Sequence, residues 1–284
     1  MSLQSSSAVS GDEPTHSNYW HIKHANLDSE VERLDGLHHG LKKYMNGKLC
    51  LAQLGFPKKI LELGAGTGIW AAEAATIYPD ADVLATDISP LPPRPLPPNV
   101  SFKQFDLLKE FPAELKPGTY DVIHARFLFI HIPNPFEIFS RILPLLAPGG
   151  HLLIEDISVN ADVKGDVPAI RSAYTALVRA WEDAGQNPLY ASQLSSFLEK
   201  EGLKVGEDHV VLPISPLSDE PKIRGLGETL RTSWNRSFDY EPSEKLVNAG
   251  YTREMHAKRK EEMANGTPWE YHTDLYFTWA QREE

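Results

Sequence analysis

The sequence predicts an α/β fold built on a doubly wound, mostly parallel β-sheet, and three observations support this prediction. Short apolar runs recur between residues 59 and 157, and they are continuous, as expected for strands covered on both faces. The segments between these runs mostly suit crossover helices, and strand–helix–strand repetition is typical of a parallel sheet. A glycine cluster, Gly64 to Gly68, follows the first run, where the chain would turn from strand to helix.

The N-terminal part of the chain predicts a tail followed by helices. Residues 1–18 are rich in Ser and carry no periodic apolar residues, which indicates a disordered tail. Helical spacing of apolar residues runs through 27–54, and Gly36, Gly40 and Gly47 predict that this stretch is divided into two or three short helices.

The central part contains five predicted strands and their crossovers. The strands are predicted at 59–63, 81–86, 99–104, 120–125 and 150–157. Residues 69–78 and 135–146 suit helices. Six of the nine residues from Pro90 to Pro98 are proline, so this connection is predicted to be an extended loop.

The C-terminal part predicts further helices and two more strands. Helices are predicted at about 166–185, 190–202, 221–237 and 242–265, and strands at about 207–213 and 274–281. A sheet that gains a strand after a helical insertion, here 215–270, fits one elaborated domain, which 284 residues can accommodate.

Composition excludes several classes of function. The 28 Lys and Arg against 39 Asp and Glu give a net charge of −11, which argues against nucleic acid as a partner. The single cysteine, Cys50, cannot form an internal disulfide, and its apolar neighbours indicate buried packing rather than a nucleophile. No secretory signal and no apolar run of roughly 20 residues is present, so we expect a soluble, cytoplasmic protein without a membrane partner.

The glycine spacing favours one ligand class over another. A dinucleotide-binding turn needs glycines at relative positions 1, 3 and 6. Here Gly64, Gly66 and Gly68 occupy positions 1, 3 and 5, and Ile69 stands at the sixth. Glu62 would repel a pyrophosphate but could accept a hydrogen bond from the ammonium of a methionine moiety. The motif therefore favours S-adenosylmethionine over NAD, the alternative being a tight turn without a ligand.

Two carboxylates follow later strands. Asp87 ends the second strand, 19 residues beyond Gly68, where a nucleoside site places an acid for the ribose hydroxyls; the alternative is a turn cap. Asp106 follows the third strand and could bind the adenine amine while Leu107 donates its backbone N–H. The alternative for Asp106 is the N-cap of a helix over 107–111.

These motifs together resemble the class I S-adenosylmethionine-dependent methyltransferases over about residues 55–160, and within them the fungal LaeA-like methyltransferases. The likeness is carried by the glycine motif and by the segments 32–35, 38–39, 78–81, 86–90, 97–100, 120–126 and 146–150. The resemblance implies a Rossmann-like, seven-stranded sheet whose last strand inserts antiparallel beside the sixth. It also implies a helical lid at 19–54 ahead of a methyltransferase domain at 55–284.

The resemblance also implies the roles of cofactor-binding residues. Glu62, Gly64, Ala65, Gly66 and Gly68 would line the methionine end, Asp87 and Ile88 the ribose, Asp106 and Leu107 the adenine, and His124, Ala125 and Arg126 the sulfonium and the substrate. Residues 127–133 depart from the LaeA-like pattern and look more like small-molecule methyltransferases generally.

Three histidines are candidate catalytic bases. His131 follows the fourth strand near the expected methyl group, although it could equally be a histidine at a helix start. His38 and His39 lie in the predicted lid, and because adjacent helical residues point about 100° apart, we expect one of them to face the site. Arg33 nearby either neutralises a substrate carboxylate or forms a salt bridge with Glu30 or Asp35.

Aromatic residues outside the nucleotide-binding core suit the walls of a substrate pocket, or else ordinary core packing. They are Tyr19, Trp20, Tyr44, Trp234 and Trp269, and Arg126 completes the predicted substrate site. No metal-ligand spacing such as H-E-x-x-H is present, so we expect methyl transfer without a metal.

The sequence thus predicts a methyltransferase that acts on a small, aromatic or secondary-metabolite substrate, at oxygen before nitrogen. One alternative is a LaeA-like regulatory protein that binds S-adenosylmethionine and a protein partner. Another is a cyclase or decarboxylase in which the sulfonium serves as a fixed positive charge. Substrate identity and oligomeric state are left open.

Overall fold

A computed structural model describes residues 27–238 and 241–284, which fold around one mixed β-sheet. The strands are β1 (Lys59–Leu63), β2 (Asp82–Asp87), β3 (Val100–Gln104), β4 (Tyr120–Arg126), β5 (Leu146–Ser158), β6 (Lys164–Gly165), β7 (Lys204–Ser215) and β8 (Trp269–Gln281). The helices are α1 (Leu27–Tyr44), α2 (Ile69–Ile77), α3 (Pro135–Ile142), α4 (Pro168–Asp183), α5 (Tyr190–Lys200), α6 (Pro221–Ser237), α7 (Glu244–Asn248) and α8 (Arg253–Ala264), with single 3-10 turns at Phe129–His131 and Leu143–Leu145.

The sheet order confirms the doubly wound prediction. The strands follow one another as β3-β2-β1-β4-β5-β8-β6, and β7 pairs with β8. Strands β1 to β5 are parallel, whereas β8 runs antiparallel to both β5 and β7, so the last strand is inserted between them. The two-residue β6 adds an eighth strand that the sequence did not predict. Because the strand order reverses between β1 and β4, the fold opens a crevice at their carboxyl ends.

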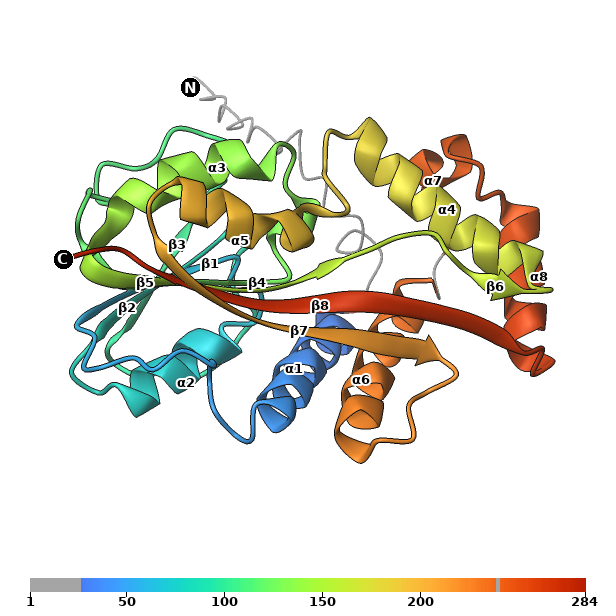
Figure 1. Cartoon of the computed structure of the whole chain (residues 1–284), viewed down its shortest axis with the longest axis horizontal. Helices are drawn as coiled ribbons and strands as arrows, with labels where there is room; N and C mark the ends of the chain where they lie inside the picture. Colours follow the sequence, from blue (N-terminus) through green and yellow to red (C-terminus); the bar gives the residue numbers. More distant parts are fainter. Residues whose placement is uncertain (1–26, 239–240) are drawn as a thin grey trace, which may run out of the picture.

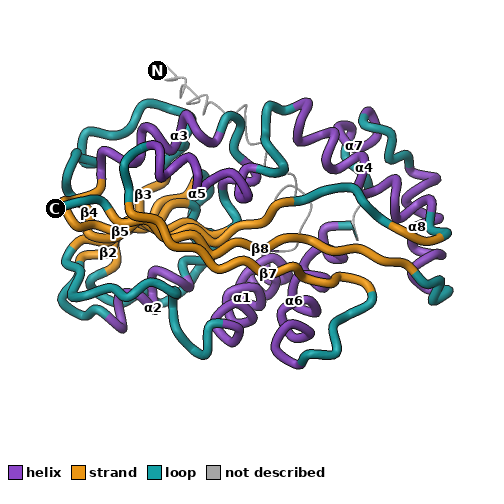
Figure 2. Tube along the Cα trace, viewed as in Figure 1, coloured by secondary structure: helices purple, strands orange, loops and turns teal. Residues whose placement is uncertain are grey.

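Helices cover both faces of the sheet (Figure 1). Helices α3 and α5 lie on one face, and α1, α2 and α6 lie on the other. The strands β7 and β8 extend well beyond the parallel part of the sheet, and α4, α7 and α8 gather around that end (Figure 2). Consequently α1 and α6, which come from distant parts of the chain, pack against each other.

Local sequence explains where the central helices begin and end. Helix α2 follows Gly68, whose φ of 74° is left-handed, and it ends before Pro79, because the residue before a proline disfavours helical geometry. Helix α3 begins with Pro135, whose fixed φ suits a first helical position. The Pro90–Pro98 segment forms neither helix nor strand, as predicted.

Several predicted boundaries were wrong. Helix α1 continues through Gly36 and Gly40, because packing against α6 and the sheet outweighs the roughly 1 kcal/mol that a helical glycine costs. The predicted helix at 242–265 is two helices, α7 and α8, separated at Gly250, which adopts a φ of 106°. No helix follows Asp106.

Cys50 lies in the segment between α1 and β1 and is buried, as predicted. Its thiol donates to the carbonyl oxygen of Ala52 at 3.5 Å, and burial raises the pKa of the thiol to about 12. Across residues 27–238 and 241–284, no helix combines the length and apolar composition that crossing a membrane requires.

Candidate functional site

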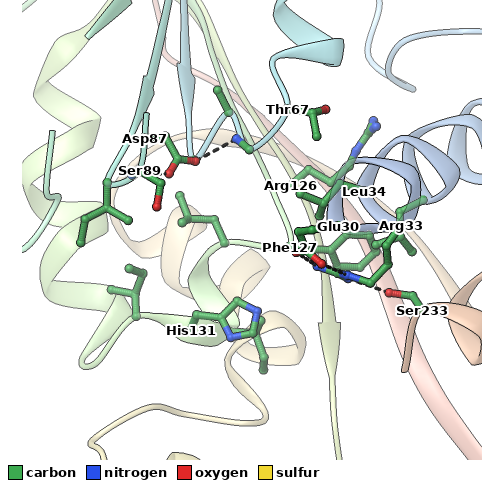
Figure 3. A pocket seen from close by; sticks show the side chains of 18 of the residues that line it. Glu30, Arg33, Leu34, Thr67, Asp87, Ser89, Arg126, Phe127, His131 and Ser233 are labelled. Atoms are coloured by element: carbon green, nitrogen blue, oxygen red, sulfur yellow. Dashed lines mark hydrogen bonds and ion pairs between the residues drawn. The ribbon is translucent and has the colours of Figure 1, made fainter. Parts of the chain in front are cut away.

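A cavity of about 490 Å³ lies at the carboxyl ends of β1, β2 and β4 and is bordered by α1 and α6. The glycine loop after β1 and the end of β2 form one side of it. Figure 3 shows Asp87 and Ser89 on that side, with Glu30, Arg33 and Ser233 across the cavity and the ring of His131 on its wall. The cavity therefore joins the predicted nucleoside end to a second compartment.

The glycine loop is shaped by left-handed backbone and close packing. Gly64, Gly66 and Gly68 have φ values of 67°, 55° and 74°, which side chains other than glycine rarely adopt. A Cβ on Gly64 would lie 2.8 Å from Cδ1 of Leu128, so a side chain there would push into the segment after β4. Gly64, Gly66 and the intervening Ala65 line the cavity directly, whereas Gly68 lies behind them.

Asp87 holds this loop in place at the end of β2. Its Oδ2 accepts the backbone N–H of Gly66 at 2.8 Å, and its Oδ1 accepts that of Ser89 at 2.8 Å. Burial raises the pKa of the Asp87 carboxyl. Since a carboxylate oxygen has two acceptor positions, Asp87 can hold the loop and still accept a ligand hydroxyl.

Ile88, predicted for the ribose, lies on the same side as Asp106 and Leu107, which are predicted for the adenine. Ile88, Asp106 and Leu107 all border the cavity. Asp106 accepts the backbone N–H of Leu108 at 2.9 Å within a turn, so its alternative role as a helix N-cap is excluded.

Glu62 presents a buried carboxyl group with one unsatisfied oxygen at the floor of the cavity. Its side chain is nearly inaccessible, and within the described residues its Oε2 has no hydrogen-bond partner. Burial raises the pKa of this carboxyl to about 8. A buried acceptor without a donor is unfavourable, so Glu62 fits a ligand that brings a positively charged donor.

Beneath the floor lies a buried charge network. His124 binds Oε2 of Glu155 through Nε2 at 2.8 Å, and the ring of Trp70 stacks on it at a centroid distance of 3.6 Å. Burial lowers the pKa of His124, so the ring is predominantly neutral at pH 7. His124 and Ala125 do not border the cavity, unlike Arg126, which continues the network by donating to Glu155 at 3.2 Å.

Helix α1 contributes His38, and not His39, to the cavity. The Nδ1 of His38 lies 3.1 Å from Nη1 of Arg126, and burial followed by the charge of Arg126 lowers the His38 pKa to about 4. His39 is exposed and donates from Nδ1 to the carbonyl oxygen of Asp35 at 2.6 Å. His38 is therefore a neutral imidazole at pH 7.

Side-chain contacts of Asp35 and Arg33 tie α1 to its surroundings. The Asp35 carboxylate accepts a hydrogen bond from Oγ1 of Thr67 in the glycine loop at 2.6 Å. It accepts another from Nη2 of Arg94 in the proline-rich loop at 2.5 Å. Arg33 pairs with Glu30 at 2.6 Å and 2.8 Å, which selects one of the salt bridges expected from the sequence. Arg33 also donates to Oγ of Ser233 at 2.7 Å and so joins α1 to α6.

His131 ends the 3-10 turn after β4 and borders the cavity. The ring of Trp181, from α4, meets the His131 ring edge-on at 6.0 Å. Trp181, Phe127, Leu34 and Ser233 also border the cavity, although sequence patterns did not single them out. Trp181, Leu34 and Ser233 lie on helices, and their positions depend on which face each helix turns inward, which spacing within one helix does not determine.

The predicted aromatic wall is only partly assembled. Trp234 borders the cavity, but Tyr44 stacks on Phe277 at 5.2 Å and Trp269 packs near Tyr174 at 6.4 Å, both away from it. Tyr19 and Trp20, like the predicted tail, lie outside the described residues. Within the part of the chain that is described, no three His, Cys, Asp or Glu side chains are grouped as metal ligands.

Comparisons with known proteins agree on one family. Residues 37–207 match a family model described as a methyltransferase domain. The chain is 38% identical over 265 residues to methyltransferase str3 of Strobilurus tenacellus, covering 90% of this chain and 94% of that protein. It is 40% identical over 255 residues to methyltransferase str2 of the same fungus, covering 87% and 92%. Similarity to the secondary metabolism regulator LAE1 of Cochliobolus heterostrophus is lower, 27% over 240 residues, covering 81% and 76%.

Proposed function

The chain belongs to the family of S-adenosylmethionine-dependent methyltransferases, and on this premise we propose that it methylates an oxygen atom of a small, ring-bearing secondary metabolite. The observation that carries the proposal is His131, an imidazole on a mainly apolar wall that continues from the glycine loop. Apolar and aromatic side chains such as Trp181, Trp234 and Phe238 border the same compartment, which suits a ring-bearing molecule.

We assign the cofactor to the glycine-loop side. Glu62 would accept the ammonium, Asp87 the ribose hydroxyls, and Asp106 with the backbone of Leu107 the adenine. The unpartnered Oε2 of Glu62 supports this assignment, because a bound ammonium would satisfy it. When bound, S-adenosylmethionine supplies a methyl group on a positively charged sulfur.

The protein residues would act mainly by positioning. The apolar walls exclude water and hold the substrate in line, and His131 accepts the proton of a hydroxyl nucleophile at its ring nitrogen. A phenol or alcohol needs such a base at neutral pH, which is why we favour oxygen. Arg126 borders the same region, and burial together with the charge of Arg126 lowers the pKa of His38 and keeps it neutral.

The test is a mass-spectrometric screen of ring-bearing hydroxyl compounds with the purified chain and S-adenosylmethionine carrying a deuterated methyl group. We expect a labelled product and its loss in His131→Asn, with kcat lower by about 100-fold or more. His39→Asn is the matched control and retains kcat within about twofold, since its ring points away from the cavity. Full activity of His131→Asn would refute the role of the base.

A regulatory function is the second candidate, because a secondary metabolism regulator is among the relatives. In that case S-adenosylmethionine would bind, but its methyl group would not be transferred to any compound in the screen. Binding of S-adenosylhomocysteine, measured by calorimetry, separates an inactive binder from a chain that does not bind the nucleoside at all.

A further inference from the structure

We propose that Asp156, together with Tyr190, is a positioning residue for His131, because its buried carboxylate holds the turn Phe129–His131 in the wall of the cavity. The inference rests on the proposed function only for the catalytic role of His131. The positioning itself is a property of the fold and is tested separately.

The Asp156 carboxylate is surrounded by donors. It lies near the end of β5 with 1% of its surface exposed, and its Oδ2 accepts the backbone N–H groups of Phe129 at 3.0 Å and Ile130 at 3.3 Å. The hydroxyl of Tyr190 donates to the same oxygen, and the N–H of Ile157 donates to Oδ1 at 2.9 Å. The first N–H groups of a helical turn have no partner inside it, so the carboxylate satisfies the donors that this turn leaves open.

The turn needs such an anchor because the backbone entering it is strained. Phe127 adopts a φ of 49°, which a bulky residue tolerates only where its surroundings fix it. Leu128 then lies against the glycine loop, where a Cβ on Gly64 would come within 2.8 Å of it. On the far side, Nε2 of Gln186 donates to the carbonyl oxygen of His131 at 2.6 Å.

Burial makes the carboxylate an unusual choice for structure alone. Burial raises the Asp156 pKa to about 6, and the four donors only partly oppose this effect. An apolar residue would fill the space between β5 and α5 without that desolvation penalty. What the carboxylate adds is a fixed position for two backbone N–H groups in a turn that brings Ile130 and His131 to the cavity, and His131 is its polar side chain there.

The test is the imidazole spectrum of the full chain by NMR with S-adenosylhomocysteine bound, with the His131 signal assigned by its loss in His131→Asn. In Asp156→Asn, an NH2 group replaces one acceptor oxygen, so we expect the His131 signal to shift or to divide. Affinity for S-adenosylhomocysteine should stay within about twofold. Tyr190→Phe removes one donor, keeps the carboxylate and should give a smaller shift.

Thr273→Val is the matched control. This substitution removes a buried hydroxyl on β8 that donates at 3.1 Å to the carbonyl oxygen of Ser158. Ser158 lies on β5, as Asp156 does, but its carbonyl oxygen does not bind the turn Phe129–His131. We expect it to leave the His131 signal unchanged. An unchanged His131 signal in a folded Asp156→Asn variant would overturn the proposal, as would a change in Thr273→Val as large as that in Asp156→Asn. If Asp156→Asn does not fold, an unchanged His131 signal in Tyr190→Phe would overturn the proposal instead. Full activity of His131→Asn would refute the role of His131 as the base, but it would not affect the conclusion that Asp156 positions His131.

Discussion

At the scale of single residues, burial changes the chemistry of Glu62 most clearly. Burial raises its pKa from the ordinary 4.5 to about 8, so the folded chain keeps a proton that the unfolded chain has already lost. Stability from this group is therefore fully present below about pH 4.5 and is lost as the pH rises towards 8. A ligand ammonium would relieve that loss, which links the protonation of one side chain to occupation of the site.

Glu62→Gln should remove this pH dependence. We expect the free energy of unfolding of the wild type to fall relative to the variant between pH 5 and pH 9, by on the order of 4 kcal/mol. Urea unfolding at several pH values measures this. The exposed Glu110→Gln serves as control and should keep the wild-type profile. A constant difference between Glu62→Gln and wild type at all pH values would contradict the prediction.

Sequence reasoning located one end of the cavity better than the other. Gly64, Asp87 and Asp106 stand at strand ends, and parallel strands bring their carboxyl ends together, so chain order alone predicts that they meet. The opposite wall depends on how helices rotate and cross. That is why Tyr44 and Trp269 lie elsewhere while Ser233 and Trp181 border the cavity.

At the scale of elements, the central strands were predicted well where apolar runs are bounded by Gly or Pro, as in β1 and β5, because such runs leave few alternatives. Helices were predicted less well where glycine occurs inside them. Propensity predicted breaks at Gly36 and Gly40, but burial of Leu37 and Leu41 against the molecule keeps α1 continuous. Tertiary packing is not visible in local sequence.

The two interior glycines of α1 should respond in opposite directions to the same substitution. A Cβ on Gly36 would meet nothing within 4 Å, so Gly36→Ala should stabilise the chain by about 0.5–1 kcal/mol. A Cβ on Gly40 would lie 2.6 Å from Cγ2 of Thr229 in α6, so Gly40→Ala should separate the helices and destabilise the chain by about 1–3 kcal/mol. Denaturant unfolding of both variants measures the difference; equal effects would show that α1 does not pack on α6 as described.

At the scale of the whole molecule, the site lies between a regular sheet and two helices drawn from opposite parts of the chain. Asp35 binds both the glycine loop, on whose side we propose that the cofactor binds, and the proline-rich loop, so α1 is attached to that side of the cavity. Ligand binding on one side should therefore stabilise the helices that close the other side.

Hydrogen exchange of backbone amides checks this coupling. With S-adenosylhomocysteine at about 100 times its Kd, exchange in the glycine loop, α1 and α6 should slow by up to about 100-fold. Helix α3 lies on the opposite face of the sheet and provides the internal control (Figure 1). Slowing confined to the glycine loop would mean that α1 and α6 move independently of the ligand.

The burial of Cys50 gives the molecule a built-in chemical reporter. Thiol reagents attack the thiolate, and a thiol with a pKa of about 12 inside the segment joining α1 to β1 reacts only after that segment separates from the core. Because the sequence contains one cysteine, the labelling rate measures how often the segment between α1 and β1 opens and reports on no other segment. The native chain thus reports how often α1 separates from the sheet without any engineered probe.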